Sequence, residues 1–238
     1  MRMTDLRVIL WDIDGTLLHS RRQGAFREYM RPALVRVFGT AGRMDEMVVS
    51  GMTDLQIFAE ALRDEGYTAE QIRGRLPELI ELFVGGMERM AAGGEMFQEL
   101  PGARAALEAL EREPRYLNSL LTGNVEAAAR LKLRLVGLEG FFRLPGAFGE
   151  LSHDRRDLPA VARERISRHL NRDLSPDQLV VIGDTPNDIA CARHFGARAV
   201  AVATGRNQTP DGLLRHSPDA LLPDLADTEL LLRTLAGL

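Results

Sequence analysis

Residues 8–18 read VILWDIDGTLL, and this stretch decides the fold. Its first four residues are all apolar, which is typical of a short strand buried on both faces of a parallel sheet. A Gly-Thr turn follows, so Asp12 and Asp14 are expected at the carboxyl end of a central strand, where open α/β sheets bind ligands. Two carboxylates are costly to desolvate unless a cation or a proton compensates them. The stretch therefore predicts a metal ion or a shared proton, although a solvated Asp-x-Asp-Gly turn would also fit it.

From about residue 100 onward the chain alternates between helical and strand patterns. Expected strands cover residues 116–121, 180–183, 198–203 and 220–222, and expected helices cover 103–111, 125–136, 158–170, 187–195 and the C-terminus. This alternation predicts an α/β fold built on a doubly wound parallel sheet.

Residues 20–97 do not follow this alternation. Helical patterns cover about 25–38, 54–65 and 69–90, and Pro77 is expected to kink or split the last of them. No convincing strand occurs between the first motif and residue 97. We therefore expect an inserted all-helical cap domain over residues 20–97, lying over the strand ends. Residues 1–19 and 98–238 would form the Rossmann-like core.

A second polar position follows the strand expected at 116–121. Thr122 precedes Gly123 and Asn124 in the run NSLLTGN, and a helix begins at about Asn124. A hydroxyl, an exposed backbone N–H and a helix N-terminus together suit an anionic oxygen. For Thr122 alone, an ordinary helix N-cap is the simpler interpretation.

The third position lies in VVIGDTPNDIACA, residues 180–192. Asp184 is expected at the tip of the strand and Asp188 four residues later, and the Pro-Asn pair between them suits a turn and a helix start. A carboxylate that only caps a helix would also explain Asp184. This is nevertheless the third polar residue at the same kind of strand end.

A basic pair lies between the second and third positions. Arg155 and Arg156 occur in HDRRDLP, just before the helix expected at 158–170. An arginine there could clamp a phosphoryl group and offset the charge of the carboxylates. A solvated arginine is the usual alternative, because the chain has many arginines.

In this order, the four motifs resemble those of the haloacid dehalogenase superfamily of phosphohydrolases. DIDGT resembles the first motif, Thr122 the second, the arginine pair the basic third and GDTPND the acidic fourth, over about residues 8–203. The third motif departs from the family, which most often has lysine there. We prefer Arg155 to Arg156, because DRxxLP with the arginine first resembles a subgroup of the family.

The resemblance implies a Mg²⁺-dependent phosphatase similar to phosphoglycolate phosphatase. Asp12 would be the nucleophile and Asp14 the general acid and base. Mg²⁺, which prefers oxygen ligands, would be held by Asp12, Asp14 and Asp184.

The remaining motif residues would have binding or supporting roles. Thr122, Gly123, Asn124 and Arg155 would hold the phosphoryl group of the substrate. Asp188 would support the metal site, and Arg156 would support the basic motif.

The resemblance also implies that residues 20–97 form a mobile cap that carries the groups selecting the substrate. His19, Arg21, Arg22 and the stretch SGMTDLQ at 50–56 are candidates for such contacts. Many phosphoglycolate-type members have arginine where this chain has Met52. That departure leaves open whether the substrate carries a second anionic group.

Composition places the chain among ordinary globular proteins. Hydrophobic residues at 45% and charged residues at 27% suit a core of sizeable volume, and the net charge of −4 does not favour nucleic acid or an acidic membrane as a partner. One cysteine, Cys191, excludes a disulfide framework within the chain and suggests the cytoplasm. No targeting signal or apolar membrane span is expected. A small phosphorylated metabolite remains the expected partner.

Three other activities and a non-enzymatic role are alternatives to the phosphatase. A dehalogenase would lack the acid/base carboxylate that Asp14 supplies. A phosphonate-cleaving enzyme needs a lysine in the cap, and the only lysine, Lys132, lies outside residues 20–97. A sugar-phosphate mutase would use the same aspartates and stays open, whereas a non-enzymatic binding protein is disfavoured because both aspartates are present.

Overall fold

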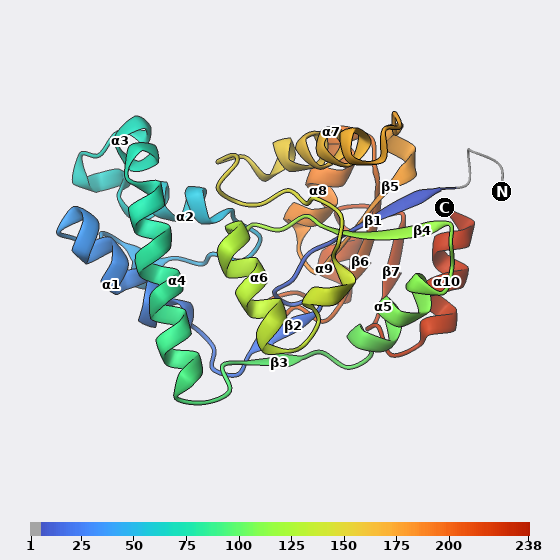
Figure 1. The fold of residues 1–238 in the computed structure, drawn as a ribbon, viewed down its shortest axis with the longest axis horizontal. Helices are drawn as coiled ribbons and strands as arrows, with labels where there is room; N and C mark the ends of the chain where they lie inside the picture. Colours follow the sequence, from blue (N-terminus) through green and yellow to red (C-terminus); the bar gives the residue numbers. More distant parts are fainter. Residues whose placement is uncertain (1–5) are drawn as a thin grey trace.

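The computed structural model describes residues 6–238, and its centre is a five-stranded sheet (Figure 1). The strands are β1 (Arg7–Trp11), β4 (Tyr116–Leu120), β5 (Leu179–Gly183), β6 (Arg198–Val202) and β7 (Ala220–Leu222). They pair in the order β4-β1-β5-β6-β7, and every pair is parallel. The chain leaves β1 for β4 on one side and later passes to β5 on the other. The switch point of the sheet, where α/β folds bind ligands, therefore lies at the end of β1.

Helices cover both faces of the sheet, which confirms the predicted α/β architecture. They are α5 (Ala103–Glu111), α6 (Glu126–Leu135), α7 (Leu158–Leu170), α8 (Pro186–Phe195), α9 (Pro210–Leu214) and α10 (Thr228–Gly237). Apolar residues of α5, α6 and α10 pack with Ile9 and Trp11, whereas those of α7, α8 and α9 pack with Val8 and Leu10. Alternate residues of β1 thus serve opposite faces, because side chains alternate along a strand. The short helix α9 had not been predicted.

Four further helices form a separate group beside the sheet (Figure 1): α1 (Phe26–Phe38), α2 (Asp54–Ala61), α3 (Ala69–Gly74) and α4 (Leu76–Ala92). The helical pattern at 69–90 splits at Arg75, and Pro77 lies in the first turn of α4, where its missing N–H costs nothing. The helix expected at 54–65 ends as α2 at Ala61, and a short 3₁₀ turn follows it at Arg63–Glu65.

A two-stranded antiparallel ribbon joins the helical group to the sheet, so the expectation of no strand in this region was wrong. Its strands are β2 (Leu18–Ser20) and β3 (Phe97–Glu99), and His19 pairs with Gln98. Strands of three residues carry too little periodicity to be found by pattern. The ribbon coincides with the predicted boundaries at 19/20 and 97/98. Residues 1–5 of the predicted core segment lie outside the described residues.

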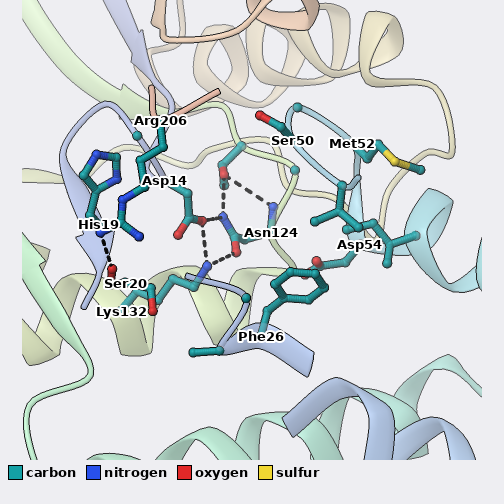
Figure 2. A pocket seen from close by; sticks show the side chains of 18 of the residues that line it. Asp14, His19, Ser20, Phe26, Ser50, Met52, Asp54, Asn124, Lys132 and Arg206 are labelled. Carbon is teal, nitrogen blue, oxygen red and sulfur yellow. Dashed lines mark hydrogen bonds and ion pairs between the residues drawn. The ribbon is translucent and has the colours of Figure 1, made fainter. Parts of the chain in front are cut away.

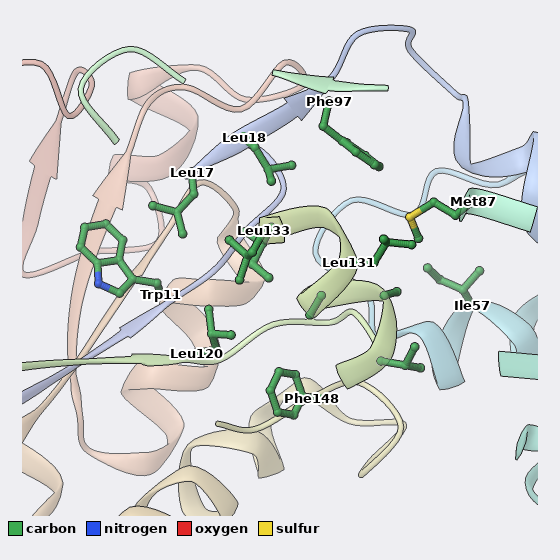
Figure 3. Packing of buried hydrophobic residues seen from close by; sticks show 14 of the residues in the cluster. Trp11, Leu17, Leu18, Ile57, Met87, Phe97, Leu120, Leu131, Leu133 and Phe148 are labelled. Atoms are coloured by element: carbon green, nitrogen blue, oxygen red, sulfur yellow. The ribbon is translucent and has the colours of Figure 1, made fainter. Parts of the chain in front are cut away.

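Helix α6 lies between the sheet and the helical group (Figure 3). Leu133 is packed near Leu17 and Leu18 of the core, and Leu131 is near Ile57 and Met87 of the helical group. One apolar cluster therefore runs through both parts of the molecule. Among the described helices, none is long and apolar enough to span a membrane.

Candidate active site

The candidate site is a pocket where the ends of three neighbouring strands meet the helical group (Figure 2). Asp12 follows β1, Thr122 follows β4 and Asp184 follows β5, and all three line the pocket. Strands β4, β1 and β5 are adjacent in the sheet. The three separate polar positions of the sequence therefore lie at one edge, at the switch point.

Two glycines allow the chain to approach the Asp184 carboxylate closely. Gly15 has φ +93°, and a Cβ there would lie 2.3 Å from Asp184 Oδ2; a Cβ at Gly205 would lie 2.1 Å from the same atom. Any side chain at either position would collide with the carboxylate, and Gly15 also needs a backbone conformation that glycine tolerates best. The Gly of the DIDGT motif therefore makes room for Asp184.

Three carboxylates gather in the buried part of the pocket. Oxygen atoms of Asp12, Asp184 and Asp188 all lie within 4.8 Å of one another, and each side chain is buried. Burial raises the pKa of Asp12 to about 6, although Arg155 opposes the effect, and burial also raises the pKa of Asp184 well above its ordinary value. Both shifts reflect the cost of holding like charges away from water.

Arg155 lies against this acidic cluster, and Arg156 does not. The Nη2 group of Arg155 donates to Asp12 Oδ1 at 2.8 Å and to Asp188 Oδ1, and the side chain is only 6% exposed. Arg156 is exposed and pairs with Asp154 on the surface. The 3₁₀ turn Arg155–Asp157 turns the first arginine inward. This placement supports the choice of Arg155 as the basic residue of the site.

Asp188 is fixed by its own helix start. Its Oδ2 accepts hydrogen bonds from the Thr185 N–H at 3.0 Å and the Thr185 hydroxyl at 2.6 Å, in a reciprocal capping box at the start of α8. Its other oxygen accepts from Arg155. Asp188 therefore orients Arg155 in addition to its possible contact with a cation.

The second motif forms a small hydrogen-bonded unit. Thr122 is fully buried, and its hydroxyl accepts from the Asn124 amide at 2.8 Å and from the Asn124 N–H at 3.3 Å. A Cβ at Gly123 would lie 2.0 Å from the Met52 carbonyl oxygen, so only glycine fits between the two loops. The loop at residues 50–53 is thus seated directly on the predicted phosphoryl-binding loop.

Asp14 lies apart from the acidic cluster, on the side of the second motif. Its Oδ2 accepts from Asn124 Nδ2 at 2.7 Å and from Lys132 Nζ at 2.6 Å (Figure 2). The Lys132 side chain is 8% exposed. Burial by itself would lower the pKa of Lys132, but Asp14, Tyr29 and Asp54 together outweigh it and the pKa is raised. No motif in the sequence predicts that Lys132 lies in the site.

Asp54, at the start of α2, belongs to the candidate stretch at 50–56, but its contact with the second-motif loop was not predicted. Its carboxylate accepts from the Val125 N–H at 2.8 Å, and its own N–H donates to the Gly123 carbonyl at 2.7 Å. The helical group is therefore pinned to the second-motif loop by a buried aspartate. The sequence pointed to Asp54 only as one member of the stretch at 50–56.

Of the other residues suggested for the cap, His19 and Arg22 line the pocket, whereas Arg21 lies outside its lining. His19 is half-buried and contacts the Thr204 carbonyl at 3.1 Å, whereas Arg21 and Arg22 form exposed ion pairs with Glu95 and Glu28. Arg206, which had not been singled out, also lines the pocket, and its guanidinium donates to the Ser20 carbonyl.

The acidic cluster fits a divalent metal ion. It offers hard oxygen donors from Asp12, Asp184 and Asp188, the ligand type that Mg²⁺ takes in proteins. Three carboxylates face one guanidinium there, which leaves negative charge for a cation to neutralise.

We expect Asp54→Asn to change how stability depends on pH. Burial raises the pKa of Asp54 to about 7 from an ordinary 3.8, although Lys132 opposes the shift. A raised pKa means that the folded chain holds the proton more tightly, so this contribution to stability is present below about pH 4 and is lost as the pH rises through about 7. Asparagine does not titrate, so the stability of Asp54→Asn should not fall in this way as the pH rises.

The free energy of unfolding, measured in urea at pH 5 and pH 8 without metal, checks this expectation. Between pH 5 and pH 8, the free energy of unfolding of wild type should fall by on the order of 2 kcal/mol more than that of Asp54→Asn. Asp45→Asn, at an exposed pair on the same helical group, is the matched control and should change little. Equal pH profiles for wild type and Asp54→Asn would contradict the assignment.

Comparisons with known proteins agree with the geometry. A family model described as HAD-hydrolase-like matches residues 157–228. A comparison with curated protein sequences gives no match.

Similar solved structures span nearly the whole chain. A predicted phosphoglycolate phosphatase from Haemophilus somnus 129PT has a TM-score of 0.65 at 20% identity, covering 97% of this chain and 99% of the other. A putative β-phosphoglucomutase from Thermotoga maritima has a TM-score of 0.57 at 22% identity, covering 96% and 99%. A CbbY variant from Rhodobacter sphaeroides in complex with xylulose-(1,5)bisphosphate has a TM-score of 0.66 at 17% identity, covering 93% and 96%. These likenesses establish the fold.

Proposed function

We propose that this chain is a haloacid dehalogenase-like hydrolase and that it acts as a Mg²⁺-dependent phosphatase on a small phosphomonoester. The observation that carries the proposal is the placement of two separated aspartates at the switch point. Asp12 lies in the buried acidic cluster with Arg155, and Asp14 lies across the pocket with Asn124 and Lys132. In this proposal one carboxylate attacks phosphorus and the other handles the proton of the leaving group.

The proposed chemistry has two steps. In the first, an Asp12 oxygen bonds to phosphorus as the bond to the leaving oxygen breaks, and Asp14 gives its proton to that oxygen. In the second, Asp14 takes a proton from water as the water oxygen bonds to phosphorus and the bond to Asp12 breaks. The chain returns to its starting state with phosphate released.

Several groups are available to position the phosphoryl oxygens. The Thr122 hydroxyl, the Gly123 N–H and the Arg155 guanidinium line the same pocket. Arg155 Nε is buried and has no hydrogen-bond partner among residues 6–238. The side-chain amide of Asn124 donates hydrogen bonds to both Thr122 and Asp14, and so links the two residues. Fixed donors of this kind supply most of what phosphoryl transfer requires.

Mg²⁺ would be held by Asp12 and Asp184, with the Asp14 carbonyl as a third protein ligand and Asp188 in support. Such an ion neutralises charge on the transferring phosphoryl group. Few protein ligands suffice, because Mg²⁺ keeps several waters.

We further propose that residues 20–97 act as a cap that selects the substrate. The loop Ser50–Met52 reaches the core, where the Gly51 carbonyl accepts from Asn187 Nδ2 at 2.9 Å. A covered pocket excludes water and favours a small metabolite, with phosphoglycolate the first compound to test. We place the enzyme in the cytoplasm, with no nucleic-acid or membrane partner, from its cysteine content and net charge.

The test is phosphate release from a panel of small phosphomonoesters, with Mg²⁺ and with chelator, using Asp12→Asn as the control. We expect metal-dependent release that is lost in the variant. A compound that is rearranged without release of phosphate would identify a mutase instead. Inactivity of the folded, metal-supplied protein on every compound, aryl phosphates included, would overturn the proposal.

A further inference from the structure

Lys132, the only lysine of the chain, places a buried ammonium group beside the proposed acid/base residue. Its Nζ donates to Asp14 Oδ2 and to Asn124 Oδ1, both at 2.6 Å. Such charge-assisted hydrogen bonds are short and about twice as strong as neutral ones. A lysine is rarely this buried unless it is paired.

The fold holds this ammonium in a fixed position. Lys132 lies in α6, which begins directly after the second-motif loop, and side chains on a helix lean toward its N-terminus. Its neighbours Leu131 and Leu133 are anchored in the apolar cluster. The Phe97 ring, from the ribbon strand β3, has its centroid 5.6 Å from Nζ. Sequence-distant elements therefore surround Lys132, and its ammonium group is held in the pocket by Asp14 and Asn124.

The hydrogen bonds distinguish the two oxygens of Asp14. Lys132 and Asn124 both donate to Oδ2, while Oδ1 accepts no hydrogen bond from the residues that the structure describes. A carboxyl group can carry a proton on Oδ1 and still accept both bonds at Oδ2. The arrangement is therefore compatible with both protonation forms that an acid/base residue passes through.

We propose that Lys132 is a positioning residue that fixes Asp14 through Oδ2 and reserves Oδ1 for proton transfer. This inference rests on the proposed function of Asp14. Lys132 also bonds Asn124, which bonds Thr122 through its amide, so one network joins the proposed acid/base residue to the phosphoryl-binding loop. A positioned proton donor matters most when the leaving group is a poor one, because proton transfer then contributes most to the barrier.

The test compares wild type and Lys132→Met on phosphomonoesters of graded leaving-group acidity. We expect the turnover of alkyl phosphates to fall about 100-fold and that of a nitrophenyl phosphate to fall only a few-fold. The ratio of the two rates does not depend on how much of the sample is folded. Arg134→Met, at an exposed basic residue of the same helix, is the matched control and should keep the wild-type ratio.

A double variant shows whether Lys132 acts through Asp14. In an Asp14→Asn background, Lys132→Met should cause little further loss on alkyl phosphates, because the group it positions is already gone. A purely structural role would instead lower activity by the same factor in both backgrounds.

Because this chain has one lysine and one buried cysteine, the ammonium can be removed and restored chemically. Lys132→Cys treated with bromoethylamine regains an ammonium on a side chain of similar length, and treatment with bromopropane gives a neutral match. We expect only the first to recover alkyl phosphate hydrolysis, and wild type treated in the same way controls for Cys191.

Equal losses on all substrates, additive losses in the double variant, or equal recovery by both alkylations would each overturn the inference. None of these outcomes affects the proposed function, which would fail instead if wild type released no phosphate or if Asp12→Asn kept full activity.

Discussion

Asp12→Asn should abolish turnover, with a fall of about 10⁴-fold or more, while the chain keeps its fold. An amide nitrogen or oxygen cannot form the bond to phosphorus that a carboxylate oxygen forms. The amide has nearly the same volume, and it removes a buried carboxyl group whose pKa burial raises to about 6. Arg155 would still pair with Asp188.

Two measurements check this expectation. Phosphate release gives the loss of turnover, and rapid denaturation after mixing with labelled substrate should trap phosphate on the wild-type chain alone. Mg²⁺ affinity must be measured beside them, because Asp12 is also a proposed metal ligand. Covalent label on the variant, or appreciable turnover by it, would show that another group attacks phosphorus.

Arg155→Met should destabilise the chain by about 3–5 kcal/mol in the absence of metal. Three buried carboxylates would then face one another without the one cation that the described residues 6–238 place beside them. Arg156→Met is a closely matched control: the neighbouring arginine is exposed and pairs with Asp154, so it should cost no more than about 1 kcal/mol. Urea unfolding at neutral pH measures both.

Metal should affect the two variants differently. Mg²⁺ should recover part of the stability lost in Arg155→Met, because a bound cation supplies the missing charge. Activity should stay about 100-fold or more below wild type, since a donor to the phosphoryl group is gone. If Arg156→Met were the more damaging change, the basic residue of the site would be Arg156 and not Arg155.

The sheet could be predicted from the sequence because its strands are short apolar runs between recognisable helices. The run before Asp12 and the run before Asp184 are buried on both faces, so their pattern did not depend on knowing their neighbours. The β2–β3 ribbon could not be predicted, since each of its strands has three residues and is defined only by its partner.

The residues of the candidate site also fall into those that could be predicted from the sequence and those that could not. Asp12, Thr122 and Asp184 were accessible to sequence reasoning because each directly follows a strand, and parallel strands bring their carboxyl ends to one edge. Lys132 and the role of Asp54 within the stretch at 50–56 were not, because these residues lie within or at the start of helices, and their contacts depend on what those helices face.

The α/β fold and the order of polar residues along the strand ends follow from the amino-acid sequence alone, because local periodicity and chain direction are sufficient for both. Which arginine turns inward, which aspartate meets the lysine, and where the helical group rests on the core are settled by tertiary packing. Those choices depend on burial and on contacts between residues more than 100 positions apart, such as Asp14 with Lys132 and Asp12 with Arg155.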